Sequence, residues 1–201
     1  MHVKTASTDY PVLNTIRDRW SPRAFANRPV AREDLLSILE AARWAPSCYN
    51  DQPWFFILAE KSAQELYEKM FNCLLPGNQK WATSAPVLML SVARTSFAQS
   101  GKPNQHALHD VGQAVAQLSI QAVSVGIFVH QMAGFNKDKA RTAFSIPDEF
   151  DPVAAIALGY PGDPIHLPED LKTMESAPRQ RRTLSEFVFN GTFGTTTDIL
   201  P

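Results

Sequence analysis

The sequence predicts an α+β fold in which helices flank a central sheet in three layers. Segments with helical spacing of apolar residues alternate with short apolar segments, in the order α, α, β, α, β, α, β, α, β and then a C-terminal arm. The chain has 201 residues, a length typical of one domain. Because 44% of these residues are hydrophobic, a sizeable core is feasible, and we expect residues 1–201 to form a single domain.

The first half of the chain contains three predicted helices and one strand. Residues 12–25 are expected to form a short helix that leads into a turn. Residues 30–45 have helical spacing with two acids in the first turn, where they suit the helix dipole, and Pro46 ends this helix. Residues 53–59, with the sequence PWFFILA, are typical of a buried strand, and residues 62–74 of an amphipathic helix.

The second half contains the longest predicted helix and three further strands. Residues 85–93 are continuously apolar, which indicates a strand covered on both faces. Residues 109–126 carry a helical stripe of small and branched side chains, and Gly126 is placed to end this helix as its C′ residue. Strands are expected at residues 127–132 and 153–160, with a helix between them.

The segment 179–201 is basic at its start and aromatic afterwards. It follows a Pro-rich linker, yet it contains Phe187, Phe189 and Phe193, so it is too apolar for a disordered tail. We therefore predict that residues 179–201 form an arm that packs on a partner subunit.

Composition argues against several functional classes. A net charge of -1 argues against a nucleic-acid surface, which needs clustered cations, and no apolar run approaches the roughly 20 residues of a membrane span. The N-terminus has no apolar signal region, and two cysteines in such a chain indicate reduced thiols, so a cytoplasmic location is expected. The glycine-rich signatures of dinucleotide and triphosphate binding and the GxSxG elbow of serine hydrolases are absent from the sequence.

Two groups of residues have both a functional and a structural interpretation. Arginines flank Ser21 near the N-terminus, and more arginines lie in PRQRR near the C-terminus. Together they suit one anionic ligand, but their spacing alone favours solvated charges with ordinary ion pairs, because surface charges are common. Ser47, Asn50 and Gln52 offer donors and acceptors to a ligand, or they bond the backbone of a turn.

Metal and nucleophile chemistry have weaker support. His106, His109 and Asp110 have helical spacing but no matching third or fourth ligand, so we expect no metal site. His130 beside an apolar strand is typical of a core or rim histidine, and Cys48 has no neighbouring base.

Six segments, in a fixed order, carry a family resemblance that covers nearly the whole chain from about residue 14 to 194. The combination of RWSxRxF with APSxxNxQPW at this spacing is specific. The chain resembles the nitroreductase family of FMN-dependent oxidoreductases. The segments are RWSPRAF (19–25), EAARWAPSCYNDQPWFFILA (40–59), NQKWATSAPVLML (78–90), HDVGQAVAQLSIQAVSVGIFVHQMAGF (109–135), IALGYPGDP (156–164) and RQRRTLSEFVF (179–189).

The resemblance implies a three-layer fold with a central, mostly antiparallel sheet and a C-terminal arm on the partner of a homodimer. It also implies non-covalent FMN at the subunit interface. Arg19 and Ser21 match residues that hold the phosphate and ribityl end, and Arg23 matches a cation near the N1/O2 edge of the ring. The implied cofactor-binding residues are Arg19, Trp20, Ser21, Arg23, Pro46, Ser47, Asn50, Gln52, Asn78, Gln131, Met132, Gly134, Arg179 and Arg181.

Within that set, different parts of the cofactor are assigned to different segments. Ser47, Asn50 and Gln52 match a segment that reaches the flavin from the second subunit, and Asn78 matches a residue bonded to the pyrimidine edge. The end of the strand at Gln131, Met132 and Gly134 matches backbone donors to N5 and O4. Arg179 and Arg181 match C-terminal phosphate cations.

The implied activity is hydride transfer from NAD(P)H through flavin N5 to nitroaromatic, quinone or similar electron-poor acceptors in a ping-pong cycle. The cofactor performs this chemistry, so no catalytic side chain is obligatory. One alternative is a flavin-binding redox sensor or carrier. Another is an FMN-dependent enzyme resembling reductive dehalogenases, for whose usual lid the region 75–108 is short.

Overall fold

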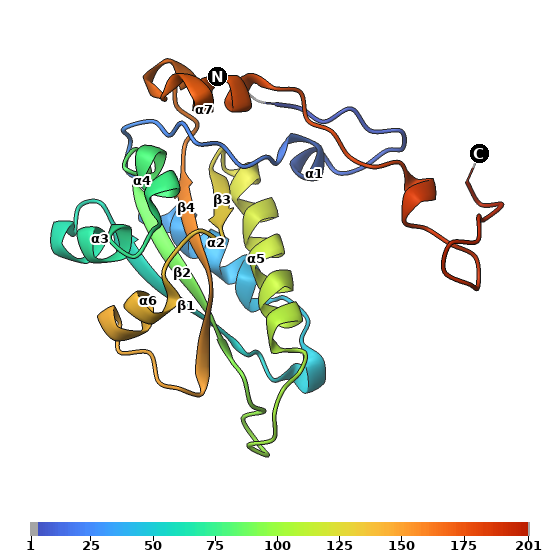
Figure 1. Ribbon diagram of the computed structural model, residues 1–201, viewed down its shortest axis with the longest axis horizontal. Coiled ribbons are helices and arrows are strands. Elements are labelled where there is room, and N and C mark those ends of the chain that lie inside the picture. The colour runs from blue at the N-terminus through green and yellow to red at the C-terminus, as the bar shows by residue number, and fades with distance from the viewer. Residues whose placement is uncertain (1–3, 201) are drawn as a thin grey trace.

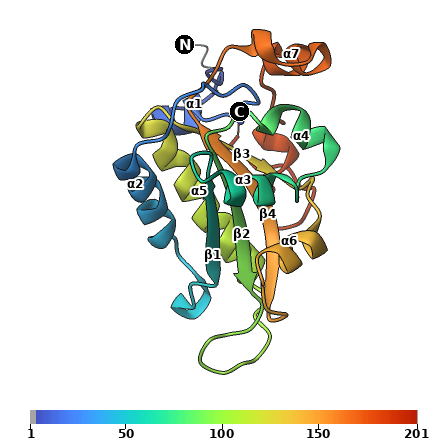
Figure 2. The same ribbon diagram turned by 90° about the vertical axis from the view of Figure 1, so that its left-hand side faces the viewer.

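The protein contains a four-stranded antiparallel sheet with helices on both faces (Figures 1 and 2). The computed structural model describes residues 4–200. The sheet order is β1-β2-β4-β3, and all three strand pairs are antiparallel. The α+β class and the antiparallel sheet are therefore confirmed. The strands are β1 (Trp54–Glu60), β2 (Val87–Arg94), β3 (Phe128–Met132) and β4 (Phe150–Gly159).

One face of the sheet is covered by α2 (Arg32–Arg43) and α5 (Ala107–Ser124). The two helices pack against each other and on the sheet, and Ile38 and Leu118 between them are fully buried. Each such side chain contributes about 1.5–3 kcal/mol of burial free energy. Gly126 follows α5 with φ +75°, as expected for a C′ glycine.

The opposite face is covered by three shorter helices, α3 (Gln64–Phe71), α4 (Pro76–Ala82) and α6 (Lys137–Ala143). Tyr67 and Trp81 belong to the core on this side. The Tyr67 hydroxyl donates to two carbonyl oxygens, those of Ala82 at 3.0 Å and Ala85 at 2.7 Å, and burial raises its pKa to about 12. These two helical layers around the sheet confirm the three-layer prediction.

Several predicted elements differ from the observed ones. The helix predicted at 12–25 is limited to α1 (Asn14–Asp18), because the chain after it is extended. Two short helices, α4 and α7 (Glu169–Ser176), were not predicted, since each is too short to show a clear apolar period.

The prediction that β1 is a buried strand is wrong. β1 lies at an edge of the sheet, and Phe55 is 42% exposed. By contrast, seven of the eight residues of β2, all but Arg94, are buried, as the sequence predicts. A run of aromatic and aliphatic residues is compatible with an edge strand and with a central strand, because sequence alone does not show which strand will lack a neighbour.

Residues beyond α7 extend away from the body as an arm, beside the N-terminal segment and α1 (Figure 1). The arm contains one short 3-10 turn at Leu184–Glu186, and Phe187 and Phe193 on it are exposed. Its packing on a partner subunit stays a prediction. Among the helices of residues 4–200, none has the length and apolarity needed to cross a membrane.

Candidate functional site

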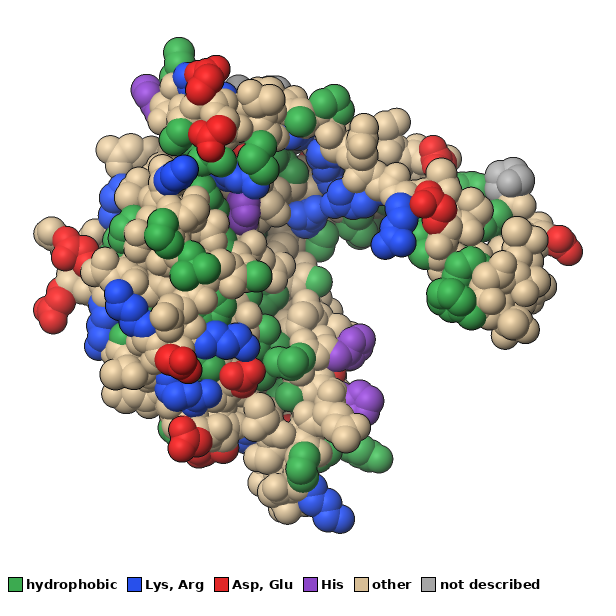
Figure 3. All heavy atoms as spheres, viewed as in Figure 1, with side chains coloured by type: hydrophobic (Ala, Val, Ile, Leu, Met, Phe, Trp, Pro, Cys, Tyr) green, Lys and Arg blue, Asp and Glu red, His purple; other side chains and the backbone are tan. Residues whose placement is uncertain are grey.

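Three arginines from the two ends of the chain lie close to one another. Arg19 directly follows α1, while Arg179 and Arg181 lie on the arm. Burial lowers the pKa of Arg19, and so does the charge of Arg181; burial also lowers the pKa of Arg179, with further contributions from Arg19 and Arg181. Figure 3 shows Lys and Arg side chains gathered in the hollow between the body and the arm.

Burial lowers the pKa of Arg179 and the charge of Asp18 partly offsets this, but in the described residues no carboxylate pairs directly with these arginines. None of the three forms an ion pair with any residue in the range 4–200. Like charges at close range cost free energy, so the cluster is stabilised when an anion binds. A guanidinium fork matches phosphate oxygens in geometry, which makes phosphate a suitable ligand.

Arg179 also has a structural role. Its Nη1 donates to the carbonyl oxygens of Lys4 at 2.8 Å and Arg17 at 2.7 Å. Because a guanidinium carries five N–H donors, these contacts fix the side chain and leave other donors for a ligand. The contacts tie the arm to the N-terminal segment and place Arg179 near Arg19.

The residues next to Arg19 pack on the start of β3. Trp20 is buried, and its ring meets that of Phe128 edge-on with centroids 6.3 Å apart. Its Nε1 has no hydrogen-bond partner in the described part of the chain, which is unusual for a buried donor. Ser21, the next residue, is half-buried.

His130 on β3 supports the adjoining turn. Its Nδ1 lies 2.8 Å from the carbonyl oxygen of Pro22, and its ring packs on Trp81 at 4.4 Å between centroids. Burial lowers the pKa of His130 to about 4, so at neutral pH the ring is neutral and Nδ1–H donates to Pro22. This agrees with the core or rim histidine predicted from the sequence.

Asn78 and Gly134 contact each other near the end of β3. The Asn78 Nδ2 donates to the Gly134 carbonyl oxygen at 2.9 Å. A Cβ at position 134 would lie 2.7 Å from that nitrogen, so glycine is needed for the close approach. Gln131 is exposed, whereas the Met132 side chain is buried in the core, so Met132 can meet a ligand only through its backbone.

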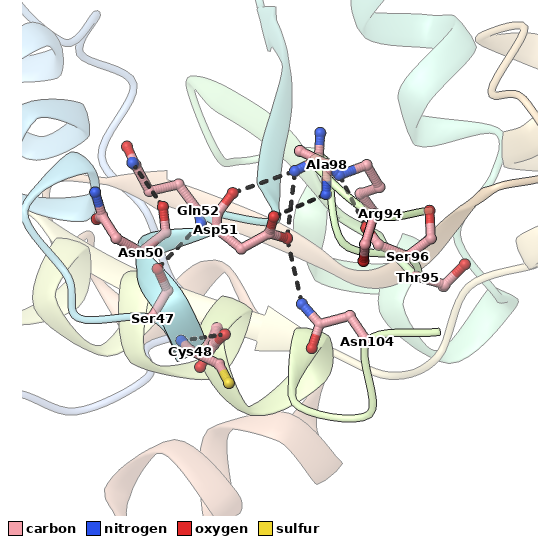
Figure 4. Close-up of polar contacts among 12 residues, drawn as sticks. Ser47, Cys48, Asn50, Asp51, Gln52, Arg94, Thr95, Ser96, Ala98 and Asn104 are labelled. Atoms are coloured by element: carbon pink, nitrogen blue, oxygen red, sulfur yellow. Dashed lines mark hydrogen bonds and ion pairs between the residues drawn. The ribbon is translucent and has the colours of Figure 1, made fainter. Parts of the chain in front are cut away.

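The segment Ser47–Gln52 forms a constrained loop at the other end of the molecule (Figure 4). Tyr49, Asn50 and Gln52 have φ values of 53°, 55° and 49°. Three consecutive or near-consecutive non-glycine residues in this left-handed region represent stored strain, which the surrounding contacts must balance.

Asp51 supplies those contacts. Its carboxylate accepts from the backbone N–H of Ala98 at 2.8 Å and from Asn104 Nδ2 at 3.3 Å, and it pairs with Arg94 at 3.3 Å. The Asp51 side chain is only 5% exposed. It therefore anchors the loop on the segment that follows β2 (Figure 4).

The turn interpretation of this loop is correct in part. The Ser47 hydroxyl accepts from the Gln52 backbone N–H at 3.0 Å, and the Gln52 side chain donates to the Asn50 carbonyl oxygen at 3.1 Å. The Asn50 and Gln52 side chains are nevertheless exposed, and so is Pro46.

Within a single chain, the Ser47–Gln52 loop lies far from the arginine cluster. The Cys48 backbone N–H donates to Asp110 at the N-terminal end of α5, at 3.0 Å, whereas Trp20 packs on Phe128 beyond its C-terminal end. The 18 residues of α5 span about 27 Å. The structure thus brings together Arg19, Trp20, Ser21, Arg23, Arg179 and Arg181 on one side, but leaves Pro46, Ser47, Asn50 and Gln52 apart from them.

A comparison with family models decides the classification. The model described as "Nitroreductase family" matches residues 16–160. The chain belongs to the nitroreductase family.

Similar proteins within and around the nitroreductase family cover most of the chain. A solved structure described as an oxidoreductase containing FMN is 38% identical, with a TM-score of 0.90, and the match covers 98% of this chain and 100% of that one. An uncharacterized 15.4 kDa protein of Mycolicibacterium smegmatis is 35% identical over 66% of this chain and 88% of its own length. The FMN reductase (NAD(P)H) of Bacillus subtilis is 25% identical over 76% of this chain and 66% of its own.

Two supporting residues of this nitroreductase-family chain were not predicted from sequence. Asp51 lies inside the segment PSCYNDQPW, but only its polar neighbours Ser47, Asn50 and Gln52 were predicted to contact a ligand. Glu175 accepts from the backbone of Arg23 at 2.8 Å across 152 positions. No pattern in one sequence indicates a contact between positions so far apart.

Proposed function

We propose that this chain is an FMN-dependent oxidoreductase that transfers hydride from NAD(P)H to nitroaromatic, quinone or similar electron-poor acceptors by a ping-pong mechanism. The observation that carries the proposal is the convergence of Arg19, Arg179 and Arg181 without a carboxylate partner in the described chain. The family assignment, the FMN-containing structural neighbour and the Bacillus subtilis FMN reductase support it.

The residues present fit FMN. A dianionic phosphate matches the three guanidinium groups in charge and in hydrogen-bond geometry. Arg23 is half-buried nearby and suits the N1/O2 edge of the ring. Asn78 and the free edge of β3 suit the polar rim of the ring, since within residues 4–200 β3 pairs only with β4.

We further propose that the active form is a homodimer with FMN at the interface. Ser47, Asn50 and Gln52 lie at the far end of α5 from the arginines, so they can reach the same ligand only from a second copy. The exposed aromatic side chains of the arm provide an apolar surface for that contact. The constrained geometry set by Asp51 presents the loop in one conformation, which reduces the entropy cost of binding.

The chemistry that bound FMN supplies is hydride transfer. The protein's contribution is then to bind and orient the ring, and to place the Arg23 charge where negative charge develops on reduction. No side-chain acid or base is required by this proposal. We also propose that residues 1–201 act as one domain in the cytoplasm, on the composition and cysteine content of the chain.

An anaerobic titration tests the proposal. The purified protein is mixed with FMN, titrated with NADH or NADPH, and then reoxidised with a panel of quinones, nitro compounds and enones. We expect a yellow protein that is bleached by the reduced nucleotide and reoxidised by at least one class of acceptor. A colourless protein that takes up no FMN would contradict flavin binding. A flavin that stays oxidised with both nucleotides would instead indicate a sensor or carrier.

A further inference from the structure

A buried carboxylate on α7 lies directly behind Arg23. The Glu175 side chain is 1% exposed, and its Oε2 is a buried oxygen without a hydrogen-bond partner in the described residues. Removing a carboxylate from water is costly unless it is bonded and paired. A residue kept at this cost should have a role that a neutral side chain cannot perform.

The two oxygens of Glu175 have different neighbours. Oε1 accepts from the backbone N–H groups of Arg23 at 2.8 Å and Ala24 at 3.1 Å. Oε2 lies 3.8 Å from Arg23 Nη1, which is within ion-pair range but beyond a hydrogen bond. One oxygen thus fixes the backbone, while the other faces the guanidinium charge.

The backbone around Arg23 is held by two further elements. The Ser84 hydroxyl accepts from the Phe25 N–H at 3.3 Å and donates to the Trp81 carbonyl oxygen at 2.9 Å, and it lies 3.4 Å from the Arg23 carbonyl oxygen. His130 bonds the Pro22 carbonyl oxygen. With this support, a neutral amide oxygen at position 175 would be sufficient to satisfy the two N–H groups, so the negative charge itself needs an explanation.

We propose that Glu175 is a positioning residue that fixes the backbone at Arg23 and attenuates the positive charge that Arg23 presents to the flavin. The inference rests on the proposed function. Arg23 is always ionised and its side chain is 23% exposed, so it can face both a ligand and Glu175. Partial neutralisation by Glu175 lowers the stabilisation that Arg23 gives to a reduced, anionic flavin, and so holds the two-electron potential below the value that Arg23 alone would set.

Two conservative substitutions separate charge from geometry. Glu175→Gln keeps an oxygen for the Arg23 and Ala24 N–H groups but removes the negative charge. We expect the equilibrium constant for two-electron reduction of bound FMN to rise about tenfold, which is about 30 mV in midpoint potential. Glu175→Asp keeps the charge but shortens the side chain, so it should lower the thermal stability of the apoprotein while changing that equilibrium constant by less than twofold.

The matched control removes a carboxylate elsewhere. Asp151→Asn disrupts a surface ion-pair group in which Asp151 lies 3.3 Å from Lys137 and 3.7 Å from Arg141, and we expect no change in potential. The measurements are spectroelectrochemical titration of the FMN-loaded protein and thermal unfolding of the apoprotein. An unchanged potential in Glu175→Gln with FMN still bound would overturn the proposal.

Other outcomes are also decisive. Should Glu175→Gln fail to fold, a shift of tenfold or more in Glu175→Asp would show that geometry rather than charge sets the potential, and the proposal would be wrong. A wild-type protein that binds no FMN would refute the proposed function itself. FMN binding with the same potential in wild type and Glu175→Gln would refute only the role of Glu175.

Discussion

The Arg179 guanidinium donates to the carbonyl oxygen of Arg17 at 2.7 Å, although 162 positions separate the two residues. This contact closes the arm onto the N-terminal segment and brings Arg179 near Arg19. The cationic cluster is therefore produced by the fold of a single chain. It does not depend on a second subunit, whereas in the proposed dimer the polar loop at Ser47–Gln52 would reach the ligand from the partner.

The first prediction concerns the phosphate end of the site. Arg19→Ala removes one of the three clustered charges and should weaken FMN binding by about 10- to 100-fold, because a hydrogen bond to a charged group contributes about 1.5–3 kcal/mol. Fluorescence titration of FMN with the apoprotein measures the affinity. Arg43→Ala is the matched control, since Arg43 is exposed on α2 and paired with Glu40, and it should leave the affinity unchanged. Equal affinities for Arg19→Ala and wild type would remove Arg19 from the site.

The second prediction concerns pH. Burial lowers the pKa of His130 to about 4, against an ordinary value of 6.5, so the unfolded state binds more protons than the folded state between these values. Stability is therefore complete above pH 6.5 and is lost as the pH falls toward 4. From pH 7 to pH 5 this group should cost about 2 kcal/mol of unfolding free energy.

Urea unfolding at the two pH values tests this expectation. His130→Gln cannot titrate in this range and should reduce the loss of stability between pH 7 and pH 5 by about 2 kcal/mol. His109→Gln, an exposed position on α5, should leave the loss as in wild type. If all three proteins respond to pH alike, the neutral, buried state of His130 is wrong.

The limits of sequence reasoning follow from the range of the interactions. The strand β2 and the helix α5 were predicted because their apolar patterns are local and long. The edge position of β1 was not, because it depends on which strands find neighbours. The arginine cluster was predicted as one anionic site only through the resemblance, since spacing alone favoured solvated charges. Glu175 had no local signal, because its partners lie about 150 positions away.

The third prediction concerns the anchor of the polar loop. Asp51→Ala leaves Arg94, the Ala98 N–H and Asn104 without their common acceptor, and it releases the strained loop. Since breaking a buried pair leaves an uncompensated charge, we expect a loss of about 3 kcal/mol of unfolding free energy in urea. FMN affinity should fall as well. Asp148→Ala, an exposed acid, is the control and should change neither quantity. Wild-type stability in Asp51→Ala would show that the network in Figure 4 contributes little.

The fourth prediction concerns Gly134. An alanine Cβ there would lie 2.7 Å from Asn78 Nδ2, so Gly134→Ala must displace the Asn78 side chain and break its bond to the Gly134 carbonyl oxygen. We expect a loss of about 1–3 kcal/mol in thermal unfolding. The double variant Gly134→Ala/Asn78→Ala should recover part of that loss, because the clash disappears. Gly112→Ala on α5, where nothing lies within 4 Å, should instead be neutral or stabilising by up to about 1 kcal/mol.

The last prediction concerns the distal arm. Deletion of residues 183–201 keeps Arg179 and Arg181 and removes the exposed aromatic side chains of Phe187 and Phe193. Among the described residues, the buried core clusters contain none beyond Leu171, so the body should remain folded, with the far-ultraviolet circular dichroism of a mixed α+β protein. Light scattering after size-exclusion chromatography should show dimers for the full chain, as proposed, and monomers for the truncated chain, whose FMN affinity should fall because the partner's loop is lost. A truncated chain that stays dimeric with full FMN affinity would contradict the proposed role of the arm, and the point variant Phe193→Ser would then be expected to behave as wild type.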